Sequence, residues 1–177
     1  MSIIEIKKIA KALNASDGAG VKLKRSIGTP DADYIDPFLM LDEFGSENKD
    51  DYVAGFPPHP HRGIETVTYM LHGEFEHEDS TGSKGIMKPG DVQWMKTGRG
   101  IIHSEMPAMK EGKLQGFQLW VNMPAKLKIK ASTNAKFLLI SGKPIGEPIA
   151  RGGPFVMNTK AEVLQAVQDY HNGTFVK

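Results

Sequence analysis

Cysteine is absent from the 177-residue sequence. Its absence excludes disulfide bonds, thiolate catalysis and thiolate-bound zinc, and it fits a reducing, intracellular setting. The chain also lacks an apolar run near the roughly 20 residues that a helix needs to span a bilayer. Its first residues mix charged and apolar side chains, unlike a signal peptide. We therefore expect a soluble, cytoplasmic protein with no membrane partner.

An excess of charge of either sign is missing too. Lysine and arginine total 22 against 21 acidic residues, which leaves a formal net charge of +1. Because this balance implies no basic face, we expect no direct nucleic-acid partner. The length suits about one domain with a real hydrophobic core.

Glycine and proline are frequent, with 19 and 11 residues, and they divide the chain into short segments. Apolar patterns between these turn residues predict β-strands. The predicted strands cover residues 3–9, 21–27, 65–71, 92–95, 101–106, 116–121 and 136–141. Short strands separated by turns are typical of an all-β sandwich or barrel and not of crossover units.

The C-terminal region has a helical pattern instead. Thr159 and Glu162 have the spacing of a capping box, in which each side chain satisfies a backbone N–H group of the other residue. Gly173 is a stop signal. Between them, apolar residues recur at helical spacing: Val163, Leu164, Val167 and Tyr170. We predict one short helix of about three turns that packs on the sheet through this stripe.

Two pairs of potential metal ligands stand out. His59 and His61 are two residues apart, and so are His103 and Glu105. In an extended segment, residues two apart point to the same face. Two such pairs on facing strands would offer three imidazoles and one carboxylate to a single point. That set suits a divalent transition metal such as iron, with one or two coordination positions left open.

Glu65 is a second acidic candidate, because it shares the strand parity of His59 and His61. A straight strand would place it about 13 Å from His61, at roughly 3.3 Å per residue. Glu105 is therefore the better ligand. For Glu65 two interpretations stay open: it orients a histidine by hydrogen bonding, or it has a purely structural role.

Residues 76–79, Glu-His-Glu-Asp, form another cluster of possible ligands. The cluster is acidic and has glycine neighbours on both sides. We expect a solvated loop here, and therefore no second metal site.

The motifs now identify a family. Residues 36–44 and several later segments resemble the pirins, iron-binding members of the cupin superfamily. The later segments are HPHRGIETVTYMLHG, HEDSTG, PGDVQWM, GRGIIHSEMP, GFQLWVNMP and GPFVMNT. The resemblance implies an all-β, cupin-type double-stranded β-helix, a jelly-roll β-barrel with a short C-terminal helix. It also implies one Fe(II) per chain on His59, His61, His103 and Glu105, ligands that other divalent metals such as zinc can occupy.

The resemblance further implies a function. Several pirins show quercetin 2,3-dioxygenase activity, so we expect an oxidoreductase that uses dioxygen to open a small aromatic, flavonol-like substrate. Glu105, if substrate binding displaces it from the metal, or Glu65 would accept the substrate's hydroxyl proton. The alternative is a non-enzymatic, iron-dependent regulator that binds a protein partner in transcription or metabolism. A zinc-dependent sugar isomerase would fit the ligand types, but the pirin motifs argue against it.

One departure from the family concerns domains. Typical pirins contain two barrels, yet here only about ten residues separate Lys126 from Phe137, where a segment resembling the end of the second barrel begins. We expect residues 1–125 to form the metal-binding barrel and residues 126–177 to be a remnant of the second domain. Because large apolar patches rarely stay exposed, we also expect a homodimer in which another copy covers the surface left behind.

Overall fold

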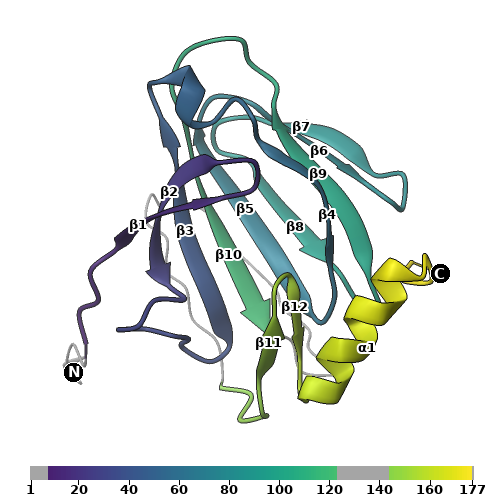
Figure 1. Ribbon diagram of the computed structural model, residues 1–177. Helices are drawn as coiled ribbons and strands as arrows, with labels where there is room; N and C mark the ends of the chain where they lie inside the picture. Colours follow the sequence, from purple (N-terminus) through teal and green to yellow (C-terminus); the bar gives the residue numbers. More distant parts are fainter. Residues whose placement is uncertain (1–7, 123–143, 177) are drawn as a thin grey trace, which may run out of the picture.

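The computed structural model describes residues 8–122 and 144–176. Most of the described chain is β-strand (Figure 1). The strands are β1 (Leu13–Asp17), β2 (Val21–Ile27), β3 (Phe38–Ser46), β4 (Phe56–His61), β5 (Ile64–His72), β6 (Phe75–Asp79), β7 (Lys84–Met87), β8 (Val92–Lys96), β9 (Ile101–Pro107), β10 (Leu114–Asn122), β11 (Ala150–Gly152) and β12 (Phe155–Met157). The helices are a short 3-10 helix η1 (Lys49–Asp51) and α1 (Lys160–His171).

Two antiparallel sheets form the barrel. The larger has the strand order β1-β2-β3-β10-β5-β8, and the smaller has the order β4-β9-β6-β7. Strands distant in sequence are neighbours in both sheets, as β3 and β10 or β4 and β9 are. This long-range antiparallel pairing is that of a jelly roll, and it confirms the predicted all-β, cupin-type double-stranded β-helix with a short helix at its C-terminal end.

The barrel interior changes from apolar to polar along its strands. Phe44 and Phe75 stack with ring centroids 5.4 Å apart, and Phe56 meets Phe75 edge-on at 6.2 Å. On the inner face of β10, buried Leu114 is followed four residues later by buried Gln118. Because burying apolar surface stabilises the fold, the aromatic end supplies a rigid core, while the other part of the interior can carry polar side chains.

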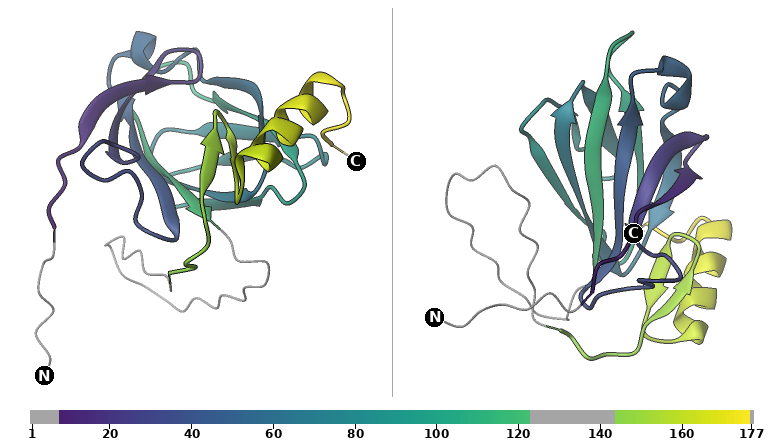
Figure 2. Two further views of the ribbon diagram at one scale, coloured as in Figure 1. Left: turned by 60° about the horizontal axis from the view of Figure 1, so that its bottom comes forward. Right: turned by 90° about the vertical axis from the view of Figure 1, so that its left-hand side faces the viewer.

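The C-terminal elements pack against the barrel. The β11–β12 hairpin and α1 lie together at the end of the barrel where β4 finishes (Figures 1 and 2). Arg62 forms a parallel bridge with Phe155 there, and the Val156 N–H donates to the Arg62 carbonyl at 3.3 Å. This segment, far away in sequence, therefore adjoins the histidine strand directly.

Helix α1 confirms the predicted capping box, since the Thr159 and Glu162 side chains satisfy each other's backbone. The predicted apolar stripe is partly wrong. Val163 and Ala166 are buried, whereas Leu164 is 63% exposed. The helix is turned so that Val163 sits against Gly152, where any larger side chain would block its approach.

The strands predicted at 21–27, 65–71, 92–95, 101–106 and 116–121 are confirmed as β2, β5, β8, β9 and β10. The solvated loop predicted at 76–79 is wrong, because these residues belong to β6 and His77 is buried. The strand predicted at 136–141 lies outside the described residues, as does most of that at 3–9, whose last two residues are not in a strand. In the described part of the chain, no helix has the length and hydropathy to cross a membrane.

Candidate metal centre

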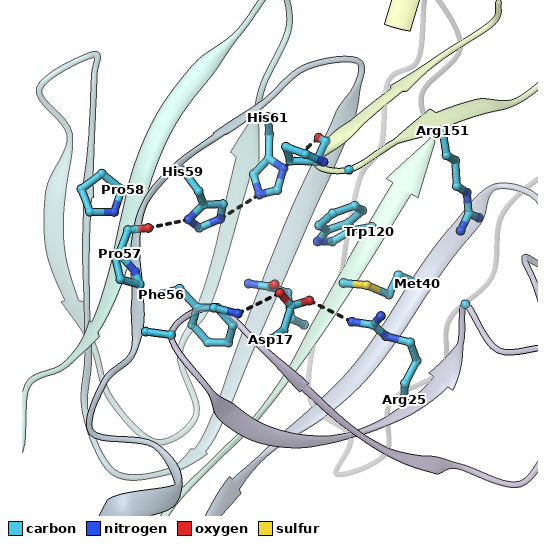
Figure 3. Close-up of a pocket in the computed structure, with 16 residues that line it drawn as sticks. Asp17, Arg25, Met40, Phe56, Pro57, Pro58, His59, His61, Trp120 and Arg151 are labelled. Atoms are coloured by element: carbon cyan, nitrogen blue, oxygen red, sulfur yellow. Dashed lines mark hydrogen bonds and ion pairs between the residues drawn. The ribbon is translucent and has the colours of Figure 1, made fainter. Parts of the chain in front are cut away.

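Strand pairing brings three histidines together. His59 on β4 lies directly opposite His103 on β9, and His61 follows two residues along β4. One nitrogen from each of the three rings lies within 4.8 Å of the others. Figure 3 shows His59 and His61 pointing into the same cavity. The two predicted pairs thus lie on neighbouring strands of one sheet.

Two backbone carbonyls fix the tautomers of His59 and His61. The His59 Nδ1 lies 2.8 Å from the Pro57 oxygen, and the His61 Nδ1 lies 3.2 Å from the Pro154 oxygen (Figure 3). A carbonyl only accepts hydrogen bonds, so each Nδ1 carries the hydrogen and each neutral ring keeps a lone pair on Nε2. The two Nε2 atoms are 3.1 Å apart. Two lone pairs at this distance repel each other unless a cation or a proton lies between them.

His103 offers the third nitrogen. Its Nε2 is buried and has no hydrogen-bond partner among the described residues. Burial, together with His59 and His61, lowers the pKa of His103 to about 2; burial, then His59, lowers the pKa of His61 to about 4. Both rings are therefore neutral near pH 7, which is the form that binds a metal.

These donors fit a divalent transition-metal ion. Two nitrogens at about 2.1 Å from an ion and at right angles to each other are about 3 Å apart, close to the observed separation of the His59 and His61 Nε2 atoms. An ion would also satisfy the buried His103 Nε2. Neutral imidazoles suit zinc, iron, copper and nickel alike, so the donor set alone does not select the metal.

Glu105 lies close to this group in sequence but is bound by other side chains. It is buried on the same face of β9 as His103. Its Oε1 accepts from the Thr68 hydroxyl at 3.1 Å, and its Oε2 accepts from the Gln118 amide at 2.8 Å. The group of three converging nitrogens does not include it, and its place as a fourth ligand stays a prediction.

Glu65 is buried on β5 and accepts a hydrogen bond from the Trp94 indole. The Nδ1 atoms of the three histidines have other partners, namely Pro57, Pro154 and His77. The structure therefore shows Glu65 hydrogen-bonded to a tryptophan and not to one of the three histidines.

Sequence reasoning missed His77 and Asp79. The His77 Nε2 lies 3.1 Å from the Asp79 Oδ2, and both side chains are almost fully buried. The signal for them was the inward alternation of Phe75, His77 and Asp79 along one strand. The outward-facing Glu76 and Glu78, which pair with a lysine on β7, hid this alternation behind an acidic run.

Asp79 is held as a carboxylate. Burial acts to raise its pKa, but hydrogen bonds from the Thr81 hydroxyl, from His77 and from the backbone N–H groups of Thr81 and Ser83 lower the pKa overall. The three bonds from Thr81 and Ser83 all go to Oδ1, at 2.6 to 3.2 Å. Its Oδ2 is therefore left for His77.

A cavity of about 660 Å³ opens onto His59 and His61. This volume lies in the range of small-molecule sites, roughly 300 to 1,000 Å³. The Trp120 ring stands edge-on to His61 at 4.9 Å and forms part of the wall (Figure 3). The residues that line it include His59, His61, Met40, Gln118 and Trp120.

Two arginines line the cavity away from the histidines (Figure 3). Arg25 binds Asp42 through two hydrogen bonds of 2.7 and 2.8 Å and Asp17 at 3.0 Å, and these partners raise its pKa against the effect of burial. Arg151 donates to the carbonyl oxygens of Asp33 and Leu39. Both guanidinium groups already have acceptors, so they form a fixed polar wall.

Comparison with known proteins places the chain in a family. The pirin family matches residues 20–121, and the pirin C-terminal cupin domain matches residues 94–176. A provisionally named quercetin 2,3-dioxygenase of Pseudomonas aeruginosa is 36% identical over 266 residues, which cover 90% of this chain and 93% of that protein. Since that alignment is longer than the chain itself, a long segment of the relative has no counterpart here.

Solved structures share the fold. A quercetin 2,3-dioxygenase from Acinetobacter baumannii superimposes with a TM-score of 0.75 at 23% identity, covering 94% of this chain and 96% of that chain. A bacterial pirin from Escherichia coli in complex with nickel(II) gives a TM-score of 0.55 at 27% identity, covering 67% of this chain and 51% of that chain.

Proposed function

The chain belongs to the pirin family, and from this premise we propose that it is an iron-dependent dioxygenase acting on a flavonol-like aromatic compound. The observation that carries the proposal is the convergence of three imidazoles, two of which line a cavity large enough for such a substrate. The similarity to a provisionally named quercetin 2,3-dioxygenase supports the choice of reaction. The nickel(II) complex of a related pirin supports the binding of a metal.

We assign the ligands as His59, His61 and His103, with Glu105 as a fourth. When bound, Fe(II) supplies a Lewis acid and a redox centre for the reaction of the substrate with dioxygen. The protein's own contribution is to hold four donors in place and to shape the cavity beside them. One iron per chain is expected, although zinc can occupy the same donors.

Cavity walls would orient a flat substrate. Trp120 and Met40 offer aromatic and polarisable apolar surface next to His61. Gln118 both lines the cavity and holds the Glu105 carboxylate. We assign Glu105 as the group that takes the proton from the substrate hydroxyl. Glu65, the other candidate for this role, hydrogen-bonds the half-exposed Trp94 on β8 instead.

We extend the proposal to the chain's organisation. In place of a complete second barrel, residues 126–177 would form a remnant, whose described part, 144–176, covers one end of the metal-binding barrel (Figure 2). Within the described residues this arrangement leaves a single group of three histidines as the metal centre. We expect the protein to act in the cytoplasm.

Metal analysis and substrate turnover test the proposal together. Protein purified without chelators should carry close to one iron per chain, consume oxygen with quercetin and release carbon monoxide. Glu105→Gln should lower kcat by about 100-fold with little change in KM, because it removes a proton acceptor but keeps the side-chain shape. Glu111→Gln, on the exposed β9–β10 connection, is the matched control and should behave as wild type.

A turnover rate no higher than that of metal-free protein would overturn the dioxygenase. If the iron were retained in that case, the alternative function would gain support: a regulator whose iron state controls binding to a protein partner. Such a regulator should bind its partner differently in the Fe(II) and Fe(III) forms.

A further inference from the structure

His103 differs from the other two histidines in what holds its Nδ1. His59 and His61 donate to backbone carbonyls, whereas the His103 Nδ1 lies 3.4 Å from the Nδ1 of a fourth histidine, His77. The two rings pack with centroids 5.3 Å apart, and both residues are buried. The partner of His103 is thus a group that can either donate or accept.

Asp79 determines whether the His77 Nδ1 donates or accepts a hydrogen bond. The Asp79 carboxylate takes three hydrogen bonds on Oδ1 from Thr81 and Ser83, and its Oδ2 lies 3.1 Å from the His77 Nε2. An ionised carboxylate only accepts, so the His77 Nε2 carries the hydrogen. In a neutral ring the other nitrogen then has a lone pair, and the His77 Nδ1 becomes an acceptor.

The same reasoning fixes His103. Facing an acceptor, its Nδ1 must carry the hydrogen, and its Nε2 is left with a lone pair. That Nε2 is the buried atom with no hydrogen-bond partner among the residues described, and it lies in the group formed with His59 and His61. The chain Asp79–His77–His103 therefore ends at the candidate metal position.

A role for His77 in packing alone does not explain its contact with His103. Asp79 satisfies only the Nε2 of buried His77. Its Nδ1 needs a donor, and nothing in packing requires that this donor be a second histidine. The register explains the contact: His77 pairs with Glu105 across β6 and β9, one step from His103 on the same inner face. The fold thus places His77 beside both predicted ligands of β9.

We propose that His77 and Asp79 are positioning residues that hold His103 in its Nδ1–H tautomer and so present its Nε2 to the metal ion. The proposal rests on the metal-binding part of the proposed function and not on the dioxygenase reaction. A hydrogen-bond partner behind a ligating histidine fixes the tautomer and the ring orientation of that ligand. For His103 this partner is His77, which Asp79 in turn holds.

Histidine tautomers can be read directly in protein labelled with ¹⁵N-histidine. Two-bond ¹H–¹⁵N spectra of the metal-free and zinc-loaded protein should show His103 protonated at Nδ1. His77→Leu removes the acceptor and should move the proton of metal-free His103 to Nε2. Zinc affinity, measured by calorimetric titration with a competing chelator, should fall about 10-fold or more, as the loss of such a partner does elsewhere.

A near-isosteric variant separates the hydrogen bond from packing. His77→Asn has almost the shape of His77→Leu but offers an amide oxygen close to the Nδ1 position, so it should restore the Nδ1–H tautomer and most of the zinc affinity. His72→Leu removes an exposed histidine at the end of β5 and should change neither property. Urea unfolding of each variant identifies any that are not folded.

The proposal is overturned if His103 stays protonated at Nδ1 in folded His77→Leu with zinc affinity within twofold of wild type. It is equally overturned if the leucine and asparagine variants are affected alike. Because the tautomer is observed without metal and without substrate, a failure of the dioxygenase activity would leave this result unchanged, and the two failures are distinguishable.

Discussion

Each histidine of the candidate metal centre has one partner atom that determines which ring nitrogen is free. For His61 that atom is the carbonyl oxygen of Pro154, 93 residues away in sequence. A ligand so fixed is already in the geometry and protonation state that an ion requires, which is what pre-organisation of a site means. The loss of one imidazole should therefore cost most of the metal.

His61→Ala tests this directly. The variant should retain only a small fraction of the metal that the wild type carries, measured by atomic emission on protein purified in parallel, because two imidazoles remain where three converged. His171→Ala is the control, since His171 is exposed at the end of α1. Equal metal contents in the two variants would place the centre elsewhere. From the sequence alone, His77 would also be a suitable control histidine. It cannot be the control in this experiment, because it contacts His103.

At the scale of the elements, the short β11–β12 hairpin helps to orient His61. It supplies the Pro154 oxygen to His61, and β12 bridges to the residue after β4. Gly63, between β4 and β5, has a φ of +84°, and a Cβ at this position would overlap the carbonyl oxygen of Val156. The hairpin can dock here only because position 63 is glycine.

Gly63→Ala should push the hairpin away and weaken metal binding through His61. We expect at least a 10-fold loss of nickel affinity by calorimetry, and a loss of unfolding free energy above the 1–2 kcal/mol of a strained φ alone. Gly82→Ala is a matched control, because Gly82 has a similar φ of +86° and open space around its Cα. It should lose stability but keep its nickel affinity; the same affinity loss in both variants would contradict this role of the hairpin.

At the scale of the whole molecule, the strands at the ends of both sheets, as far as the described residues show, carry exposed apolar side chains. Ile86 on edge strand β7 is 47% exposed, and Val92 and Trp94 on edge strand β8 are 59% and 44% exposed. An unpaired apolar edge can pair with another chain. The dimer expected from the sequence therefore has a candidate surface on β8.

Light scattering at micromolar concentration should give about twice the chain mass of 19.4 kDa. Val92→Lys should shift the protein toward the monomer, because it replaces the most exposed apolar side chain of edge strand β8 with a charge. Val53→Lys changes a valine of 43% exposure outside the two sheets and should leave the dimer intact. A wild-type mass of 19.4 kDa would end the dimer hypothesis.

Much of this protein follows from local patterns in its sequence. The spacing of His59 and His61, and of His103 and Glu105, determines that each pair shares a face, because strand geometry repeats every two residues. The capping box fixes where α1 begins, since its two hydrogen bonds join residues three apart. Continuous motifs were enough to identify the family and with it the fold.

The partners of those residues were decided by the tertiary structure. The closure of the whole barrel determines that β9 lies beside β4. It also sets the register that places His59 opposite His103. The Pro154 carbonyl could not be foreseen, because every residue carries such an acceptor and only docking of the hairpin selects one. Likewise His77 was hidden in an acidic run until β6 placed it against β9 and turned it inward. Local periodicity sets the direction of a side chain, whereas long-range packing sets what that side chain meets.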